Sequence, residues 1–151
     1  MFQSKFDEIR FNISGVHFKF SVGEFALITG LKCVDDFERN KIGKSINNLV
    51  AKFFNGSSKV RRSDIKECFV TTNFDCDEDA LKMTVLYFIS NFLFSAPKDK
   101  FVNEYFLDVV DADLYNQYPW GKDVFSFALD CVRRRFMGAE KKEESCILFY
   151  F

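Results

Sequence analysis

Residues with the chemistry for catalysis are sparse in this chain of 151 amino acids. It contains one histidine, His17, and five cysteines at irregular spacing, without a Cys-x-x-Cys pair. A cysteine or serine nucleophile needs a neighbouring base, and His17 falls on the exposed face of a predicted hairpin. A structural zinc site needs about four ligands at short, paired spacings. The sequence therefore predicts that the chain is not an enzyme, has no metal or cofactor, and keeps its thiols free in a reducing compartment.

Two short motifs resemble parts of ligand-binding loops. Gly43-Lys44-Ser45 matches the end of a phosphate-binding P-loop, but Glu38 stands where that pattern needs a glycine, and a carboxylate there would repel phosphate. The alternate aspartates of residues 75–79 resemble the first ligands of a calcium loop, but the glycine and glutamate positions of that loop hold Ala80 and Leu86. We interpret these acids as charges at the positive end of a helix.

The net charge of −1 hides a strong segregation along the chain. Residues 39–66 carry eight basic residues and one acidic residue, a net +7, whereas residues 67–118 carry a net −7. Two interpretations follow, and we favour the first. The two segments attract each other within one domain, or the basic segment forms a nucleic-acid face. The second interpretation assigns nucleic-acid contacts to Lys41, Lys44, Lys59, Arg61 and Arg62.

The N-terminal part alternates apolar and polar residues in the manner of a β-hairpin over residues 8–20. A two-residue turn at Ser14-Gly15 pairs Ile13 with Val16 and places all apolar side chains of the hairpin on one face, which helices must cover. Ser21 and Glu24 form a capping box that opens a helix, and Gly30 is placed to end it in the left-handed conformation.

The rest of the chain predicts helices over residues 46–54, 77–94, 101–110 and 123–136, and a short helix through Phe69 that Ser63 caps. The 77–94 helix is apolar nearly all round, with Asp75 and Glu78 as its N-terminal capping pair, so it is predicted to be central and buried. The fold class is a mostly helical α+β fold, with the hairpin packed on a bundle of about five helices. One domain spans residues 1–151. The predicted core includes Phe11, Phe18, Leu27, Leu86, Phe88, Ile89 and Phe92.

Two further apolar features stand near the C-terminus. Tyr118-Pro119-Trp120 is predicted to be a rigid aromatic corner that packs as structure, and an exposed Tyr118 or Trp120 would instead anchor a partner. The tail 146–151 is apolar and β-prone, and it is expected to add a strand beside the hairpin or to leave an exposed edge. No apolar run reaches the ~18 residues of a membrane span, and no signal peptide opens the chain, so we expect a nuclear or cytoplasmic protein without membrane contact.

Three stretches carry a family resemblance: residues 20–33 (FSVGEFALITGLKC), 86–93 (LYFISNFL) and 109–125 (VVDADLYNQYPWGKDVF). Together they resemble DUF1985, a plant family of domains of unknown function. The resemblance implies an origin in Mutator-like transposable elements and a position ahead of a SUMO-protease-like cysteine peptidase domain. It carries over no catalytic residue. Relatives usually continue past the segment that matches 146–151, so the resemblance also implies that this chain is truncated at its C-terminus.

The sequence thus predicts a non-catalytic module that binds a protein partner. The alternative is an accessory domain that binds nucleic acid through residues 39–66, and for that alternative we expect weak affinity only.

Overall fold

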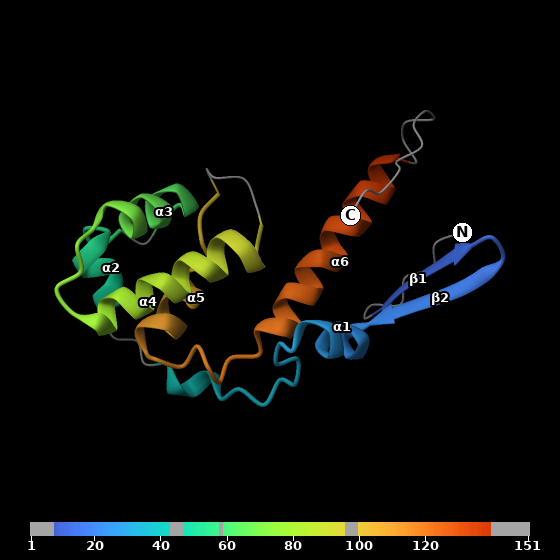
Figure 1. The fold of residues 1–151 in the computed structure, drawn as a ribbon, viewed down its shortest axis with the longest axis horizontal. Coiled ribbons are helices and arrows are strands. Elements are labelled where there is room, and N and C mark those ends of the chain that lie inside the picture. The colour runs from blue at the N-terminus through green and yellow to red at the C-terminus, as the bar shows by residue number, and fades with distance from the viewer. Residues whose placement is uncertain (1–7, 43–46, 58, 96–99, 140–151) are drawn as a thin grey trace. The chain divides into compact units, whose positions relative to one another are not determined.

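A computed structural model describes residues 8–42, 47–57, 59–95 and 100–139 of the chain. It confirms a mostly helical α+β fold with an N-terminal hairpin (Figure 1). Its internal contacts divide it into two compact units. Unit 1 combines residues 1–34 with 119–151, and unit 2 comprises residues 35–118. A single domain over residues 1–151 stays a prediction.

Unit 1 begins with the predicted hairpin. β1 (Glu8–Ile13) pairs antiparallel with β2 (Val16–Ser21), and the register joins Ile13 to Val16 as expected. Ser14 and Gly15 have φ of 51° and 85°, the pair of left-handed conformations that a type I′ turn requires. The Gly15 N–H donates to the Asn12 side chain over 2.9 Å, which closes the turn.

The apolar face of the hairpin is covered only near its base. There the ring of Phe20 packs against Phe125 with centroids 6.0 Å apart. Towards the turn, Ile13, Val16 and Phe18 are 57%, 56% and 43% exposed, so the predictions that helices cover the whole face and that Phe18 is buried are wrong for the described residues. A six-residue strand extends about 20 Å, and the ring contact of Phe20 lies at the end farthest from the turn. The side chain of Phe11 and the tail 146–151 lie outside the described residues.

α1 (Val22–Thr29) follows β2 directly and has both predicted ends. Glu24 accepts hydrogen bonds from the backbone N–H and the hydroxyl of Ser21, and Gly30 ends the helix with φ of 68°. Phe25 packs on Phe125 with ring centroids 5.4 Å apart. Leu27 lies about 200° further round the helix. It is 87% exposed, so the prediction that it is buried is wrong.

α6 (Trp120–Ala139) begins directly after Pro119, three residues before the predicted start. Two stretches of the sequence that carry the family resemblance meet at this point. The Gly121 N–H donates to the Lys32 carbonyl over 2.9 Å, and an added Cβ on Gly121 would lie 2.4 Å from Cys33 Sγ. Burial raises the pKa of the Cys33 thiol, which keeps it in the neutral form.

Unit 2 contains the remaining helices (Figure 1). They are the short 3₁₀ helix η1 (Arg39–Lys41), α2 (Asn48–Phe53), α3 (Arg62–Thr71), α4 (Asp77–Phe88), the π-helix η2 (Ile89–Leu93) and α5 (Glu104–Asp111). α3 and α5 both pack on α4. The core of the unit consists of side chains with at most 2% exposure: Leu49, Val60, Ile65, Met83, Leu86, Ile89, Leu107, Val109 and Val110.

The helix ends of unit 2 depend on contacts distant in sequence. The Asp111 carboxylate of α5 accepts hydrogen bonds from the backbone N–H groups of Asn48 and Leu49, at 2.9 and 3.1 Å, and so caps α2. The predicted caps of the next two helices are wrong. The N-cap of α3 is Arg61, whose N–H donates to Asp64, and not the predicted Ser63.

Cys76 occupies the N-cap position of α4 and provides no side-chain cap, so the predicted capping pair of Asp75 and Glu78 does not form. Glu78 pairs with Lys82 instead, with the ammonium 2.8 Å from the carboxylate. Lys82 is only 7% exposed overall, and its Nζ also lies 2.9 Å from Asp113 and 3.0 Å from the Asp111 carbonyl. The acids at the start of α4 therefore serve the helix dipole and a buried lysine.

α4 buries one face and not its whole circumference. Leu86 and Ile89 are 0% and 2% exposed, which confirms them as core residues. Phe88 and Phe92 are 50% and 62% exposed, so the prediction that they are buried is wrong. α3 and α5 both pack on α4, and the exposure of Phe88 and Phe92 shows that they leave part of its circumference to solvent.

Candidate interaction surfaces

An apolar surface lies over the C-terminal half of α4. Four rings form a continuous series across three elements: Phe69 of α3, Tyr87 and Phe88 of α4, and Phe92 of η2, together named here the aromatic surface. Phe69 and Tyr87 stack with centroids 4.5 Å apart and planes 4° apart. Phe92 contacts Tyr87 at 5.9 Å and Phe88 at 5.6 Å. Such rings supply large contact area at low entropic cost, and they are the usual anchors of protein interfaces.

The exposure of this surface follows from the sequence spacing. Phe88 and Phe92 are four residues apart, so they share one side of the helix, and Leu81 extends the same side one to two turns toward the N-terminus. Leu81 is 52% exposed. Val70, next to Phe69 on α3, is 70% exposed. Apolar side chains that are at least half exposed thus extend from Phe92 and Phe88 along α4 to Leu81, and Val70 adds one on α3. This arrangement differs from the single exposed apolar residues that are scattered over most protein surfaces.

The end of α4 widens into a π-turn at Ser90 and Asn91, the two residues that interrupt the apolar run of the sequence. The Phe94 N–H donates to the Ile89 carbonyl, five residues back, over 3.0 Å. The Ser90 hydroxyl donates to the Leu86 carbonyl at 2.7 Å, and the Asn91 amide donates to the Tyr87 carbonyl at 3.1 Å. Side chains thus act as hydrogen-bond donors to backbone carbonyls within the wide turn. π-helical turns are rare in proteins as a whole, and those that occur are often found at functional sites.

Arg62, the first residue of α3, is held by this turn. Its Nε–H donates to the Ser90 carbonyl, and the residue is only 7% exposed. No carboxylate pairs with Arg62 in the described part of the chain. Burial lowers the pKa of its guanidinium, although arginine stays charged in proteins. Arg62 is therefore a buried cation to which the described residues supply no compensating charge.

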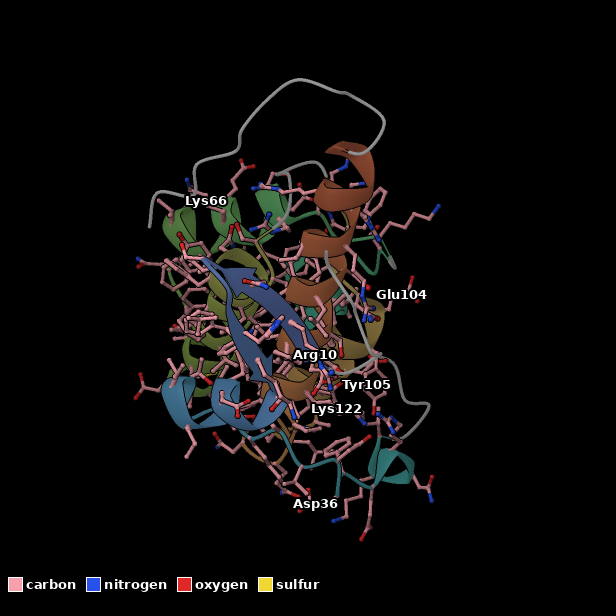
Figure 2. All side chains as sticks on the ribbon, turned by 90° about the vertical axis from the view of Figure 1, so that its right-hand side faces the viewer. Arg10, Asp36, Lys66, Glu104, Tyr105 and Lys122 are labelled. Atoms are coloured by element: carbon pink, nitrogen blue, oxygen red, sulfur yellow. The ribbon has the colours of Figure 1, made fainter. Side chains whose placement is uncertain are left out.

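A groove of about 340 Å³ lies beside Arg62. One stripe of α3 forms most of it, with Asn91 of η2 completing the wall; its lining residues are Arg62, Ser63, Lys66, Glu67, Val70, Thr71 and Asn91. Lys66 is exposed on α3 (Figure 2), and Glu67 is exposed beside it. The groove thus combines two cations, one anion and an apolar side chain.

The residues predicted to contact nucleic acid do not converge as a set. Lys41 lies in η1 beside Glu38, at 3.6 Å, and Figure 1 places η1 well apart from α3 within unit 2. Lys44 lies outside the described residues. Lys59 and Arg61 are exposed, next to the start of α3. Arg62 is buried and its Nε–H donates to the Ser90 carbonyl, so it does not share one exposed face with Lys59 and Arg61, and its contact with nucleic acid stays a prediction.

A second small cluster surrounds Arg61. An antiparallel bridge joins Arg61 to Phe101, and the guanidinium lies 5.5 Å from the centre of the Phe101 ring. Phe101 is 52% exposed, while Val60 and Val102 beside the bridge are buried and anchor it. The sequence analysis missed Phe101 because the bridge joins residues forty positions apart. The signal for this bridge is a buried valine between exposed neighbours on each side of it, Val60 beside Arg61 and Val102 beside Phe101.

Tyr118 and Trp120 are 3% and 8% exposed, and Pro119 between them is fully buried. Within unit 2, the ring of Tyr118 lies 5.1 Å from Phe37 and 6.0 Å from Phe106. These positions match the structural interpretation of the aromatic corner. Neither ring offers the exposed face that a partner-binding anchor needs.

The opposite charges of residues 39–66 and 67–118 meet at Lys52 and Asp79, whose side chains form an ion pair over 2.5 Å. The hydrogen bond of this pair lowers the pKa of Asp79 and raises that of Lys52. Lys52 is about half exposed, so the pair contributes little to stability. This pair is one contact between the two segments, and the interpretation that the segments attract each other stays a prediction.

The side chains considered for catalysis or metal binding do not come together in the described structure. His17 is exposed on β2, opposite Asn12, as predicted. Arg10 lies on the same hairpin (Figure 2), where Glu8 accepts its Nε–H at 2.6 Å. Within the described ranges, no group of three or more His, Cys, Asp or Glu side chains is placed to hold a metal ion. Across those ranges, no helix combines the length and apolar character needed to cross a membrane.

The fold and these surfaces define a mostly helical α+β domain with solvent-facing apolar and cationic features. Comparison with known families identifies it further: the model described as "Domain of unknown function (DUF1985)" matches residues 1–130. The chain belongs to the DUF1985 family. No curated protein and no solved structure matches it.

Proposed function

We propose that this chain is a non-catalytic protein-interaction module whose partner docks on the aromatic surface. The observation that carries the proposal is the series of four rings that ends in Phe88 and Phe92, with half or more of each of these two side chains facing solvent. A helix that buries Leu86 and Ile89 needs no aromatic residues on its opposite side for its own stability. Their exposure has a cost in solubility that a bound partner removes.

The partner that this surface fits is an amphipathic helix. Leu81, Phe88 and Phe92 lie along one side of α4 and η2 over about 16 Å, the span of three helical turns, and a partner helix would match them with apolar residues at i, i+3/4 and i+7. Asp77 is exposed at the N-terminal end of α4, so a basic residue on the partner would complement that end. The resemblance noted above adds a setting to this proposal: a plant, transposon-derived protein of the nucleus or cytoplasm, from a family whose members often precede a SUMO-protease-like peptidase domain.

A site-specific crosslink tests the proposal. A photoreactive phenylalanine analogue placed at Phe92 should crosslink a discrete partner in cell extract, and the same analogue at Phe101 serves as a matched control because both rings are more than half exposed in unit 2. The partner is then purified, and its affinity is measured by calorimetry. Phe88→Ser with Phe92→Ser should weaken binding by about thirtyfold or more, whereas Phe101→Ser should leave it within about twofold. Equal capture from both positions, or unchanged affinity, contradicts the proposal.

Nucleic-acid binding is the second candidate, and the observation that favours it is the Arg61–Phe101 contact. An exposed ring with a guanidinium over it, and with Lys59 and Lys100 exposed nearby, resembles the stacking platforms of proteins that bind single strands. The exposed acids Glu67 and Glu104 belong to the helices that follow Arg61 and Phe101. They reduce the local positive potential, so we expect affinity in the non-specific range only.

A further inference from the structure

The buried guanidinium of Arg62 indicates a ligand. A cation removed from water is costly unless an opposite charge compensates it, and the described part of the chain supplies none to Arg62. Its Nε–H is satisfied by the Ser90 carbonyl, which fixes the plane of the guanidinium. Its two terminal amino groups have no hydrogen-bond partner among the described residues, and they are not sealed from solvent. Arg62 meets solvent in the groove that it lines.

The charges around the groove select the class of ligand. Arg62 and Lys66 supply two positive charges and Glu67 one negative charge, so the lining is net +1. A singly charged carboxylate balances it, whereas a phosphate dianion would leave an excess negative charge close to Glu67. The planar fork of arginine matches the two oxygens of a carboxylate.

The shape and the apolar part of the groove select the rest of the ligand. A volume of about 340 Å³ exceeds what a carboxylate fills, and Val70 lies along the groove with 70% of its surface exposed. A ligand with a short apolar stem would cover Val70 while its carboxylate reaches Arg62. The π-turn keeps this arrangement rigid, because Ser90 and Asn91 are each hydrogen-bonded to preceding carbonyls.

We propose that the groove between α3 and η2 is a binding site for a carboxylate on a short apolar stem, held by Arg62 and Lys66. The site contains none of the four rings of the aromatic surface, although Val70 borders both, and the inference does not depend on the proposed function. Two sources share this chemistry, the glutamate side chain of a peptide and a small free acid.

A titration followed by ¹H–¹⁵N NMR tests the site with three probes: N-acetyl-glutamate amide, the matching glutamine compound and butyrate. The glutamate probe should shift the backbone amides of residues 62–71 and Asn91 in a saturable manner, with a dissociation constant of about 1 mM for a ligand of this size. The glutamine probe should produce no saturable shift. Tighter binding of the glutamate probe than of butyrate identifies a peptide as the source, and the reverse order identifies a free acid.

Two exposed neighbours provide charge variants with opposite expected effects. Lys66→Gln should weaken binding of the glutamate probe by about fivefold, and Glu67→Gln should strengthen it by about twofold to fivefold. Lys59→Gln is the matched control, since Lys59 is exposed in the same unit and does not line the groove; it should change the affinity by less than about twofold. These three side chains are exposed, so the variants are expected to fold. Arg62→Lys, which retains charge but loses the planar fork, should abolish saturation.

Three results overturn the inference. Equal shifts with the glutamate and glutamine probes would show that no carboxylate is recognised. Lys66→Gln and Glu67→Gln effects of the same sign, or a Lys59→Gln effect as large as that of Lys66→Gln, would show general electrostatics without a site. Inorganic phosphate binding more tightly than the glutamate probe would refute the class of ligand.

Discussion

Replacing Gly121 by alanine should destabilise the chain by about 1–3 kcal/mol, the range for overpacking in a rigid site. An ideal Cβ on Gly121 would lie 2.4 Å from Cys33 Sγ, 2.9 Å from Leu31 Cβ and 3.0 Å from the Lys32 carbonyl oxygen. The first of these atoms can move by rotation of one side-chain bond. The other two belong to the backbone or lie next to it, and the Lys32 carbonyl also accepts the Gly121 N–H. Relief therefore requires the chain at residues 31–33 to move away from the start of α6.

The expected change in unfolding free energy for Gly121→Ala has the opposite sign to the usual one. Glycine to alanine within a helix ordinarily stabilises a protein by up to about 1 kcal/mol, because alanine restricts the unfolded chain. Gly23 is the matched control, since it is the second residue of α1 as Gly121 is the second residue of α6. A Cβ on Gly23 would meet only Ser21 Oγ, at 3.6 Å, an ordinary contact. Gly23→Ala should therefore be neutral or stabilising.

Urea unfolding followed by far-ultraviolet circular dichroism measures both variants. A double-mutant cycle with Cys33→Ala then separates the contacts. Removing Cys33 Sγ should recover about 1 kcal/mol of the loss in Gly121→Ala and no more, because the contacts to residues 31 and 32 persist. A Gly121→Ala variant as stable as Gly23→Ala would refute the close packing of α6 against residues 31–33.

Three further measurements test other parts of the structure. Leu86→Ala should cost about 2–5 kcal/mol of unfolding free energy in a urea titration, whereas Phe88→Ala should cost about 1 kcal/mol or less, since half of that side chain faces solvent; equal losses would contradict the assigned buried face of α4. Burial alone would lower the pKa of Lys82, but its two carboxylate partners raise the pKa above the ordinary 10.5. The stability difference between the native chain and Lys82→Met should therefore be constant from neutral pH to pH 10.5 and should fall above it. A difference that stays constant to about pH 12 would count against this pairing. In fluorescence anisotropy with labelled single-stranded and duplex DNA, the native chain should bind no more tightly than about 10⁻⁶ M at physiological salt; sub-micromolar binding that Lys59→Gln with Arg61→Gln abolishes would favour the nucleic-acid function.

Local features of unit 1 were predictable because neighbouring residues determine them. The Ser14-Gly15 turn sets the hairpin register, and the Ser21–Glu24 pair and Gly30 mark the ends of α1. Each depends on chemistry within about four residues, where spacing and residue type are sufficient. Leu27 shows the limit of this reasoning, since the burial of a helical residue depends on which side the neighbouring helices cover.

Unit 2 was harder to predict because its decisive contacts are distant in sequence. Apolar residues surround α4, so the sequence pattern has no preferred face, and only the packing of α3 and α5 leaves Phe88 exposed. The basic segment presented a similar problem. Arg61 and Arg62 are adjacent and chemically equivalent, yet one lies over the exposed Phe101 ring and the other is buried against Ser90. The backbone at the start of α3 gives the two side chains different surroundings, and their residue type alone does not predict this difference.

The stretches that carry the family resemblance serve the packing of unit 1 and part of the candidate sites of unit 2. The stretches 20–33 and 109–125 supply Phe25, Gly121 and Phe125, which pack β2, α1 and α6 together in unit 1. The third stretch, 86–93, supplies Tyr87, Phe88 and Phe92 of the aromatic surface and Asn91 of the groove. Phe69 and the other groove residues lie on α3, outside all three stretches, so a match to the stretches says little about that wall of the groove. A relative that keeps the packing residues but replaces Arg62 or Phe92 would retain the fold and lose the corresponding surface, so functional assignments within the family should be tested at α3 and η2.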